Sequence, residues 1–283
     1  MIILDGKKLA LAQSKKLHSR VAKLKQHGQT PGLAVVMVGQ HPASAVYVQN
    51  KQKFCQELGI NFYLVEFPAT ATSADICNKI HLLNQDKKIH GIILQLPLPD
   101  KLSDPTGLLS EIDPRKDVDG LHPLNLGLLA LGQEIFVPAT PKGVLALLRE
   151  YKIPLAGRKV VVVGFGPIAG MPLSLLLARA KSTVTIAQDK TKDLSIWLKS
   201  ADIVISAAGQ PGLIKGNMIK SGAVVVDVGI TKRGKQWLGD VDFATVSKRA
   251  GYLTPVPGGV GPLTVSALID NVVTAAEYWG RGA

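Results

Sequence analysis

Short, almost uninterrupted apolar runs alternate with longer stretches of helical periodicity along most of the chain. In the first half the runs are GLAVVMVG (32–39), NFYLVEF (61–67) and GIILQLPL (91–98), and the stretches between them (43–58 and 72–85) have helical periodicity. Runs that are apolar on both faces are typical of parallel strands covered by helices on both sides. The sequence therefore predicts an α/β unit with alternating strands and helices, preceded by a helix over 5–26 that ends near Gly28.

A second series of the same kind begins near residue 158. Its apolar runs are RKVVVVG (158–164), STVTIA (182–187), DIVISAAG (202–209) and AVVVDVGI (223–230). Between the two series, residues 99–141 are rich in Pro, Gly and Asp and are predicted to form a functional loop and an interdomain connection. We therefore expect two α/β domains, at 1–140 and 141–261, with a C-terminal helix (262–283) that returns to the first domain.

Composition excludes several classes of protein. The net charge of +12 favours anionic partners, but the lysines are dispersed and no basic run with interleaved aromatics is present, so nucleic acid is not an expected partner. Cys55 and Cys77 are the two cysteines, and no Cys/His spacing suggests a metal site, so a reducing, cytoplasmic location and no metal are expected. The uncharged stretch 160–178 approaches membrane-spanning length, but its internal glycines and prolines argue against a membrane helix.

A glycine-rich turn follows the first strand of the second series. In VVVVGFGPIAGMP, Gly164, Gly166 and Gly170 lie between a predicted strand and a predicted helix. Such glycines permit a tight turn and a close approach of the backbone to a pyrophosphate, and the helix N-terminus supplies free N–H groups. The strand before and the helix after favour dinucleotide binding over a purely structural turn.

An acid follows the next strand. Asp189 comes directly after STVTIA and Gln188, where dinucleotide-binding folds often place a carboxylate that binds the ribose. Such a carboxylate would accept from the 2′-hydroxyl of NAD and repel the 2′-phosphate of NADP. The alternative is a solvated turn acid, and the neighbouring Lys190 weakens the charge argument.

Three polar residues share one face of the predicted helix over 43–58. Ser44, Tyr47 and Lys51 stand at i, i+3 and i+7, so they could line a site together, although solvated surface is an open alternative. A Tyr-x-x-x-Lys pair also occurs in short-chain dehydrogenases, where it follows the glycine loop. In this chain the pair precedes the glycine loop, which contradicts that family.

Further polar residues occur near strand ends and in a rigid turn. Gln95 is the one polar residue of GIILQLPLP, near the carboxyl end of a strand where α/β sheets bind ligands, and it is either a site residue or a satisfied core amide. Asp117 and Asp119 in KDVDG are either turn formers or ligands. The segment TPVPGGVGPLT (254–264) suits close approach to a flat ligand or an interdomain hinge, and one of its X-Pro bonds could be cis.

Together these segments resemble the bifunctional methylenetetrahydrofolate dehydrogenase/methenyltetrahydrofolate cyclohydrolase family. The resemblance covers nearly the whole chain, through VGQHPASAVYVQNKQKFCQELGI, GIILQLPLP, KDVDGLHPLNLG, PATPKG, the glycine loop, GAVVVDVGI, GDVDF and TPVPGGVGPLT. It implies an N-terminal α/β folate and catalytic domain plus a Rossmann-type dinucleotide-binding domain, with a cleft between them, usually in a homodimer. It also implies oxidation of 5,10-methylenetetrahydrofolate with NAD(P)⁺ and hydrolysis of the methenyl product to 10-formyltetrahydrofolate.

The resemblance also implies roles for individual residues. Lys51 would be the catalytic residue of the cyclohydrolase, hydrogen-bonded to Gln95, with Tyr47 stacking on the folate and Asp119 accepting from the pterin edge. The other implied substrate-binding residues, for a folate that could be polyglutamylated, are Ser44, Pro257, Gly258 and Gly259. The implied cofactor-binding residues are Gly164, Phe165, Gly166, Ile168, Gly170, Asp189, Ala208 and Ile230.

The chain departs from the family where the adenosine end of the cofactor is expected. Members commonly carry Arg-Ser after the first glycine of the loop and a Ser after the second strand, and here these positions are Phe165, Gly166 and Asp189. Loss of a cation and gain of an acid favour NAD over the NADP usual in the family. Two other interpretations stay open: a cyclohydrolase with weakened or NAD-shifted dehydrogenase activity, and a non-catalytic nucleotide-sensing or folate-binding protein.

Overall fold

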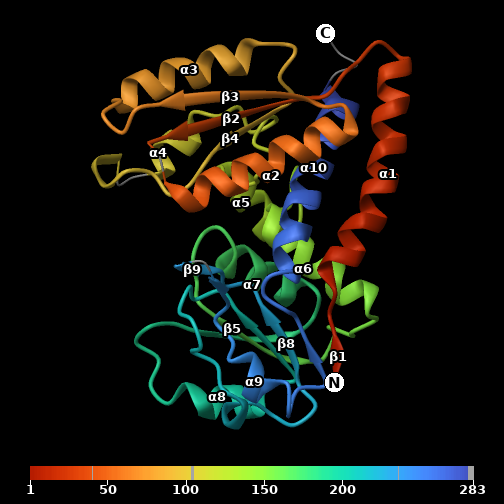
Figure 1. Ribbon diagram of the computed structural model, residues 1–283, viewed down its shortest axis with the longest axis vertical. Coiled ribbons are helices and arrows are strands. Elements are labelled where there is room, and N and C mark those ends of the chain that lie inside the picture. The colour runs from red at the N-terminus through yellow and green to blue at the C-terminus, as the bar shows by residue number, and fades with distance from the viewer. Residues whose placement is uncertain (40, 103–104, 235, 280–283) are drawn as a thin grey trace. The chain divides into compact units, whose positions relative to one another are not determined.

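The computed structural model describes residues 1–39, 41–102, 105–234 and 236–279 and divides into two compact units (Figure 1). Unit 1 comprises Met1–Leu11 and Thr140–Thr264, and unit 2 comprises Ala12–Ala139 and Val265–Ala283. Helices α1 (Gly6–Gln26) and α10 (Val260–Trp279) each contribute residues to both units. The sequence predicted a two-domain α/β protein, and this fold class is confirmed, although the first eleven residues group with unit 1 rather than with the expected N-terminal domain.

Unit 2 contains a three-stranded parallel sheet in the order β3-β2-β4. Its strands are β2 (Gly32–Val38), β3 (Asn61–Phe67) and β4 (Gly91–Leu94), connected by helices α2 (Pro42–Leu58) and α3 (Ser73–Gln85). The side chain of Thr72 accepts from the backbone N–H of Asp75 and caps α3. The apolar run 91–98 extends beyond strand β4, which ends at Leu94. After the strand, the backbone N–H of Gln95 still donates to the carbonyl of Val36, and the Leu96–Pro97 bond is cis.

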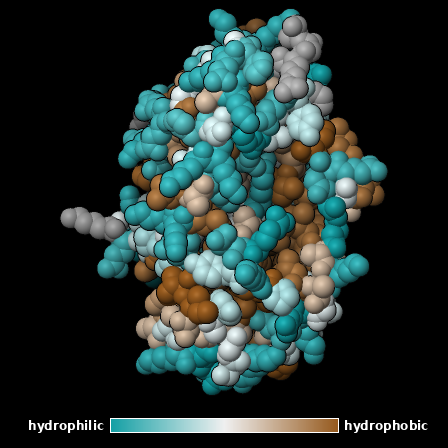
Figure 2. Space-filling view, turned by 90° about the vertical axis from the view of Figure 1, so that its right-hand side faces the viewer, coloured by the Kyte–Doolittle hydropathy of each residue, from teal (hydrophilic) through white to brown (hydrophobic). Residues whose placement is uncertain are grey.

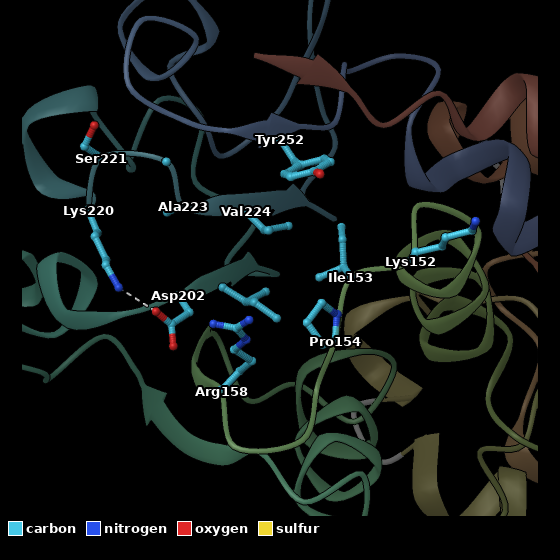
Figure 3. Close-up of a pocket in the computed structure, with 12 residues that line it drawn as sticks. Lys152, Ile153, Pro154, Arg158, Asp202, Lys220, Ser221, Ala223, Val224 and Tyr252 are labelled. Carbon is cyan, nitrogen blue, oxygen red and sulfur yellow. Dashed lines mark hydrogen bonds and ion pairs between the residues drawn. The ribbon is translucent and has the colours of Figure 1, made fainter.

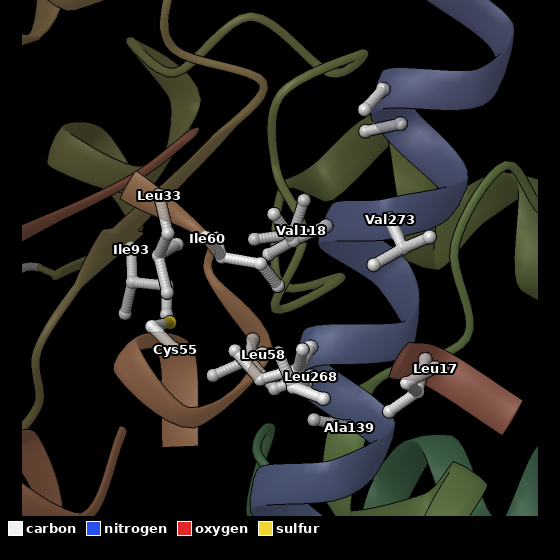
Figure 4. Close-up of a cluster of buried hydrophobic side chains, with 14 of the residues drawn as sticks. Leu17, Leu33, Cys55, Leu58, Ile60, Ile93, Val118, Ala139, Leu268 and Val273 are labelled. Atoms are coloured by element: carbon white, nitrogen blue, oxygen red, sulfur yellow. The ribbon is translucent and has the colours of Figure 1, made fainter. Parts of the chain in front are cut away.

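The alternation of side chains along β2 divides the core of unit 2 into two layers. Leu33, Val35 and Met37 pack with residues of α1, α2 and α10, whereas the residues between them pack with α3 and α4 (Pro105–Ser110). Figure 4 shows the first layer, in which Cys55 lies against Leu33 and Leu268 comes from α10. Residues of α10 thus pack with β2 inside unit 2, and apolar burial holds them there.

The segment over residues 99–141 is more ordered than the predicted loop. It contains α4, α5 (Pro123–Leu131) and the start of α6 (Ala139–Glu150). The loop prediction was wrong for these residues because prolines were treated only as helix breakers, although proline is well tolerated in the first helical turn. In α5, Pro123 follows the cap residue His122, and Gly132 ends the helix in the left-handed region at φ 77°.

Unit 1 contains a six-stranded parallel sheet in the order β1-β11-β8-β7-β5-β6. The strands are β1 (Ile2–Ile3), β5 (Lys159–Val163), β6 (Thr183–Ala187), β7 (Ile203–Ser206), β8 (Val224–Asp227) and β11 (Tyr252–Leu253). Helices α7 (Gly170–Arg179) and α8 (Leu194–Ser200) follow β5 and β6, and a hairpin of β9 (Thr231–Arg233) and β10 (Gln236–Leu238) precedes α9 (Phe243–Val246). The pairing of β1 with β11 explains why the first residues belong to this unit.

Alternate side chains of strand β5 point to opposite faces of the unit 1 sheet and pack with different helices. Val160 and Val162 pack with residues of α6 and α7, and Val161 and Val163 pack with residues of α8 and α9. This arrangement leaves the carboxyl end of the sheet for the glycine-rich turn that connects β5 to α7.

Hydrophilic side chains dominate the face drawn in Figure 2, with hydrophobic residues visible between them. Within the described part of the chain, no helix combines the length and the apolar character that a membrane crossing requires.

Candidate functional site

Helix α2 of unit 2 presents the Ser44, Tyr47 and Lys51 face predicted from the sequence. The helix has proline at its first turn and ends at Gly59, whose φ of 69° is the left-handed conformation that glycine favours. Ser44 and Lys51 are 4% and 7% exposed, and Tyr47 is half-buried. A solvated helix face is therefore excluded for Ser44 and Lys51.

Gln95 lies beside Lys51 and fixes the position of its side chain. Lys51 Nζ donates to Gln95 Oε1 at 2.9 Å, and Gln95 Nε2 donates to the carbonyl of Leu96 at 2.8 Å. Ser44 Oγ donates to the same carbonyl at 3.3 Å. Because both ends of the Gln95 amide are engaged, its carbonyl oxygen is held toward the lysine.

Burial changes the proton affinities of the groups around Lys51. It lowers the pKa of Lys51, against the opposing effect of the carboxylate of Asp119. It raises the pKa of Asp119, and here Lys51 acts in the opposite direction. Cys55, one turn along α2, has its pKa raised to about 12, again mainly by burial. The site therefore disfavours the charged form of Lys51, so Nζ loses its proton at a lower pH than an exposed lysine does.

The two acids of KDVDG have different environments. The buried carboxylate of Asp117 accepts from the backbone of Leu121 at 3.2 Å, the backbone of His122 at 2.8 Å and Asn125 Nδ2 at 2.8 Å. Asp117 is therefore the turn-forming acid. Asp119 is only partly buried and interacts electrostatically with Lys51, so it is the candidate for ligand binding.

The sequence analysis did not identify Asn271 of α10, which supports the loop bearing these acids. Its Nδ2 donates to the carbonyl of Val118 at 2.8 Å and to that of Val137 at 2.9 Å, and its side chain is buried. An amide on a mostly apolar helix was the available signal, because a buried amide needs partners. Asn271 holds the backbone of the residue immediately before Asp119.

In unit 1, the turn after β5 has the close backbone packing expected of a dinucleotide-binding loop. Gly164 has a φ of 95°, and a Cβ there would lie 2.4 Å from the carbonyl oxygen of Ala207. A Cβ at Gly170 would lie 2.1 Å from the carbonyl oxygen of Gly164, whereas one at Gly166 would meet open space. Two glycines therefore permit the packing, and the third leaves room for a phosphate to approach the backbone at the start of α7.

The other predicted cofactor residues of unit 1 are mostly exposed. Phe165, Ile168 and Ile230 are 40%, 44% and 37% exposed. Asp189 has a side chain that is 68% exposed and pairs with the even more exposed Lys190 at 3.5 Å. Ala208 differs, because its N–H donates to Asp240 Oδ2 at 2.7 Å. Asp189 is therefore accessible to a ligand, in competition with its neighbouring lysine.

Pro257, Gly258 and Gly259 also belong to unit 1, whereas the other predicted substrate-binding residues belong to unit 2. The Val256–Pro257 bond is cis, in agreement with the expectation for this segment. The carbonyl of Gly258 accepts from the backbone of Lys7 at 3.0 Å, and a Cβ at Gly6 would lie 1.7 Å from the carbonyl oxygen of Gly259. Packing against the N-terminal segment therefore accounts for part of this glycine-rich turn.

A cavity of about 370 Å³ lies at the opposite edge of the unit 1 sheet (Figure 3). Arg158, Asp202 and Ala223 line it, and each comes directly before a strand. Lys220 donates to Asp202 at 2.6 Å, while the side chain of Lys152 points away. Ligands of open parallel sheets bind beyond the carboxyl ends of the strands, so this cavity is separate from the candidate dinucleotide site.

Comparisons with known proteins agree with this division. The family model described as the tetrahydrofolate dehydrogenase/cyclohydrolase catalytic domain matches residues 4–119, and that described as the NAD(P)-binding domain of the same family matches residues 138–279. The bifunctional protein FolD 2 of Geobacter metallireducens is 48% identical over 281 residues, which is 99% of this chain and 98% of the relative.

Solved structures give the same result. The bifunctional FolD enzyme of Campylobacter jejuni is 43% identical, with a TM-score of 0.95 over 98% of this chain and 99% of that chain. The Trypanosoma brucei enzyme, described in complex with NADP cofactor and an inhibitor, is 39% identical, with a TM-score of 0.95 over 100% of this chain and 99% of that chain. These findings favour bifunctional activity over a cyclohydrolase with weakened dehydrogenase activity. The chain belongs to the bifunctional tetrahydrofolate dehydrogenase/cyclohydrolase family of enzymes.

Proposed function

We propose that Lys51 is the acid–base group of this bifunctional enzyme, which oxidises 5,10-methylenetetrahydrofolate and hydrolyses the 5,10-methenyl product to 10-formyltetrahydrofolate. The observation that carries the proposal is the buried Lys51 ammonium, held by Gln95 at 2.9 Å, with a pKa lowered by burial. A lowered pKa makes the neutral amine of Lys51 more accessible, and an acid–base catalyst needs both the neutral and the protonated form.

The hydrolytic step needs a proton acceptor and then a proton donor. Water adds to the methenyl carbon, and the neutral amine of Lys51 takes a proton from it as the carbon–oxygen bond forms. The bond from this carbon to N5 then breaks, and Lys51 returns its proton to the departing nitrogen. The carbon-bound hydroxyl releases its proton to solvent as the formyl carbonyl forms, so one proton is released overall. Gln95 keeps Nζ in place in both states, because its carbonyl oxygen accepts from an amine and from an ammonium alike.

The residues around Lys51 support folate binding on the same face of unit 2. Tyr47 offers an aromatic ring for stacking, and burial raises the pKa of its hydroxyl, which stays protonated at neutral pH. Asp119 offers two acceptor oxygens for the donors of a pterin edge. Ser44 is engaged with Leu96, so we assign it the support of Gln95 as well as a place near the substrate.

The glycine-rich turn of unit 1 fits the pyrophosphate of a nicotinamide dinucleotide. When bound, the dinucleotide supplies the hydride acceptor for oxidation of the methylene carbon. The backbone around Gly166 binds phosphate, and Phe165 and Asp189 disfavour a 2′-phosphate because neither supplies a positive charge. We therefore propose NAD as the preferred cofactor, although NADP is the usual cofactor of the family.

Paired assays test these assignments. Oxidation of methylenetetrahydrofolate is measured with NAD and with NADP, and hydrolysis of methenyltetrahydrofolate is measured separately, on the wild type and on Lys51→Met. We expect a higher kcat/KM with NAD and loss of hydrolysis in the variant. A higher kcat/KM with NADP would refute the cofactor assignment, and hydrolysis by Lys51→Met at the wild-type rate would refute the role of Lys51.

Three further expectations accompany this function. The substrate class is a reduced folate, which could carry a polyglutamate tail, and the enzyme is proposed to act in the cytoplasm as a homodimer. Sedimentation of the purified protein tests the oligomeric state, and competition between mono- and polyglutamylated folates tests the tail preference.

A further inference from the structure

A buried carboxylate connects the loops at the carboxyl end of the unit 1 sheet. Asp240 follows β10 and is fully buried. Its Oδ2 accepts from Ser206 Oγ at 2.9 Å, from the backbone of Ala208 at 2.7 Å and from the backbone of Gly209 at 3.2 Å. One oxygen therefore holds the last residue of β7 and two residues of the loop after it, Ala208 and Gly209.

A second buried carboxylate, Asp227 at the end of β8, holds Asp240 in turn. Asp227 Oδ1 accepts from the backbone of Asp240 at 3.0 Å, and Oδ2 accepts from the backbone of Val241 at 2.9 Å. Burial and the nearby Asp240 raise the pKa of Asp227 to about 7. The two carboxyl groups therefore share one closely packed region.

Two glycines permit this packing. A Cβ at Gly229 would lie 2.1 Å from Asp240 Oδ1, and a Cβ at Gly239 would lie 2.0 Å from Asp227 Oδ2. The carboxylate of Asp240 thus lies against Gly229, and that of Asp227 lies against Gly239. The absence of a side chain at each glycine lets the segments 227–229 and 239–240 pack closely together. The loop after β8, which includes the predicted cofactor residue Ile230, is positioned by the same contacts.

The glycine-rich turn rests on the backbone that Asp240 holds. A Cβ at Gly164 would lie 2.4 Å from the Ala207 carbonyl oxygen and 3.1 Å from the Ala208 nitrogen, so this peptide lies directly against the first glycine of the turn. Because peptide groups are planar and trans, the Ala208 carbonyl points opposite to the Gly209 N–H and hence away from Asp240. Asp240 therefore holds the Ala207–Ala208 peptide on which the glycine-rich turn packs. It also sets the direction of the Ala208 carbonyl, which is a hydrogen-bond acceptor.

A role in stability alone does not account for Asp240. Its Oδ1 is buried and has no hydrogen-bond partner among the described residues, which is costly for a carboxylate whose only task is packing. The hydrogen bonds it does make go to the loops at the edge where parallel sheets bind their ligands. We infer that Asp240, oriented by Asp227, is a positioning residue that sets the loops of the dinucleotide site, an inference that rests on the dinucleotide site proposed above.

Calorimetric titration of NAD and of NADP, without folate, into the wild type, Asp240→Ala and Asp240→Asn tests this inference. In the alanine variant the three donors lose their acceptor, and we expect dinucleotide affinity to fall about 30-fold. Asparagine keeps one oxygen for the same donors without its charge, so we expect a loss of about threefold. Asp242→Ala is the matched control: Asp242 lies two residues away and caps α9 through Thr245, and its variant should bind dinucleotide like the wild type.

Hydrolysis of methenyltetrahydrofolate separates positioning from general destabilisation, because its proposed catalytic residues, Lys51 and Gln95, lie in unit 2. We expect both Asp240 variants to hydrolyse within twofold of the wild type. Wild-type dinucleotide affinity in the Asp240 variants, or hydrolysis that falls in parallel with affinity, would overturn the inference. If Asp240→Ala does not fold, the dinucleotide affinity and the hydrolysis rate of Asp240→Asn are compared with those of the wild type in the same way. A wild-type protein that binds neither dinucleotide would instead refute the proposed dinucleotide site.

Discussion

The two candidate sites are built in different ways. Around Lys51 in unit 2, the functional groups are hydrogen-bonded side chains, with Lys51 buried and Gln95 half-buried, in a chain of contacts that ends at the Leu96 carbonyl. In the glycine-rich turn of unit 1, the backbone makes the site, and the nearby side chains of Phe165 and Asp189 are exposed. The candidate reacting side chains thus lie in unit 2, whereas the candidate site of unit 1 is formed mainly by backbone. Asp240 holds part of that backbone through hydrogen bonds to Ala208 and Gly209.

This difference predicts how each site responds to substitution. Removing a side chain at the Lys51 site removes a reacting group, so its effect on rate should be large and specific to hydrolysis. Changing an exposed side chain of the turn leaves the backbone intact, so it should alter the choice of cofactor more than the rate. The following predictions test this contrast.

The largest effect is expected for Lys51→Met, which keeps an unbranched side chain and removes the amine. General acid–base catalysis typically contributes about 10²- to 10⁴-fold, so hydrolysis of methenyltetrahydrofolate should fall at least about 100-fold. Oxidation of methylenetetrahydrofolate should persist, since hydride transfer depends on positioning. Lys53→Met, on the same helix but exposed, is the control and should retain both activities.

A smaller effect is expected when the family pattern is restored in unit 1 by Phe165→Arg, Gly166→Ser and Asp189→Ser together. Hydrogen bonds to a charged group contribute about 1.5–3 kcal/mol, so the ratio of kcat/KM for NADP over NAD should rise roughly 10- to 100-fold. The serine at 166 has room, because a Cβ there meets open space. An unchanged cofactor ratio would show that other residues choose the cofactor, and hydrolysis measured in parallel should not change.

The pH profile of hydrolysis offers a finer test of the Lys51 site. Lys51 has a pKa lowered by burial and partly restored by Asp119, so the neutral amine and the rate should increase with pH. In Asp119→Asn the opposing negative charge is gone, the pKa of Lys51 should fall further, and the rising limb of kcat should move to lower pH. Asp113→Asn, which removes an acid paired with Arg115, is the control and should not shift the rising limb of kcat along the pH axis. Movement to higher pH would contradict the electrostatic assignment.

The smallest expected effect concerns the stability of unit 1. Asp227 has a pKa of about 7 in the folded protein, above the ordinary value of about 3.9 for an unfolded chain. The folded state therefore holds a proton that the unfolded state has lost, and this stabilisation is present at low pH and disappears as the pH rises through about 7.

Thermal unfolding should consequently show a Tm that falls by roughly 5 °C between about pH 5 and about pH 7.5. Asp227→Asn cannot ionise, and the part of the slope due to this residue should vanish even if the variant is less stable at every pH. An unchanged slope in Asp227→Asn would assign the pH dependence to other groups.

Local sequence predicted much of the fold because most elements carry their own signals. The apolar runs became β2, β3, β5 and β6 within one residue at each end, and the helical stretch over 72–85 became α3. Strands β1 and β11 were missed, since each has two residues and β1 pairs with a segment some 250 residues away. Two-residue strands have no periodicity to read, so only the assembled sheet reveals them.

The same distinction applies to the sites. The glycine-rich turn and the Ser44, Tyr47 and Lys51 face could be predicted because spacing along one strand-turn-helix or one helix fixes their geometry. The sequence could not separate the roles of Asp117 and Asp119, which differ in the hydrogen bonds made by nearby loops. It also gave no reason to join Asp227 with Asp240.

The sequence by itself determined the class of the fold, the family and the candidate residues for the chemistry, because these depend on periodicity and short motifs. Only the tertiary structure decided which polar groups are buried, which of them are paired, and how their pKa values shift. Burial and pairing arise when distant segments meet in a medium of low polarity, as Lys51 meets Gln95 and Asp240 meets Ser206. No local stretch of sequence contains that information.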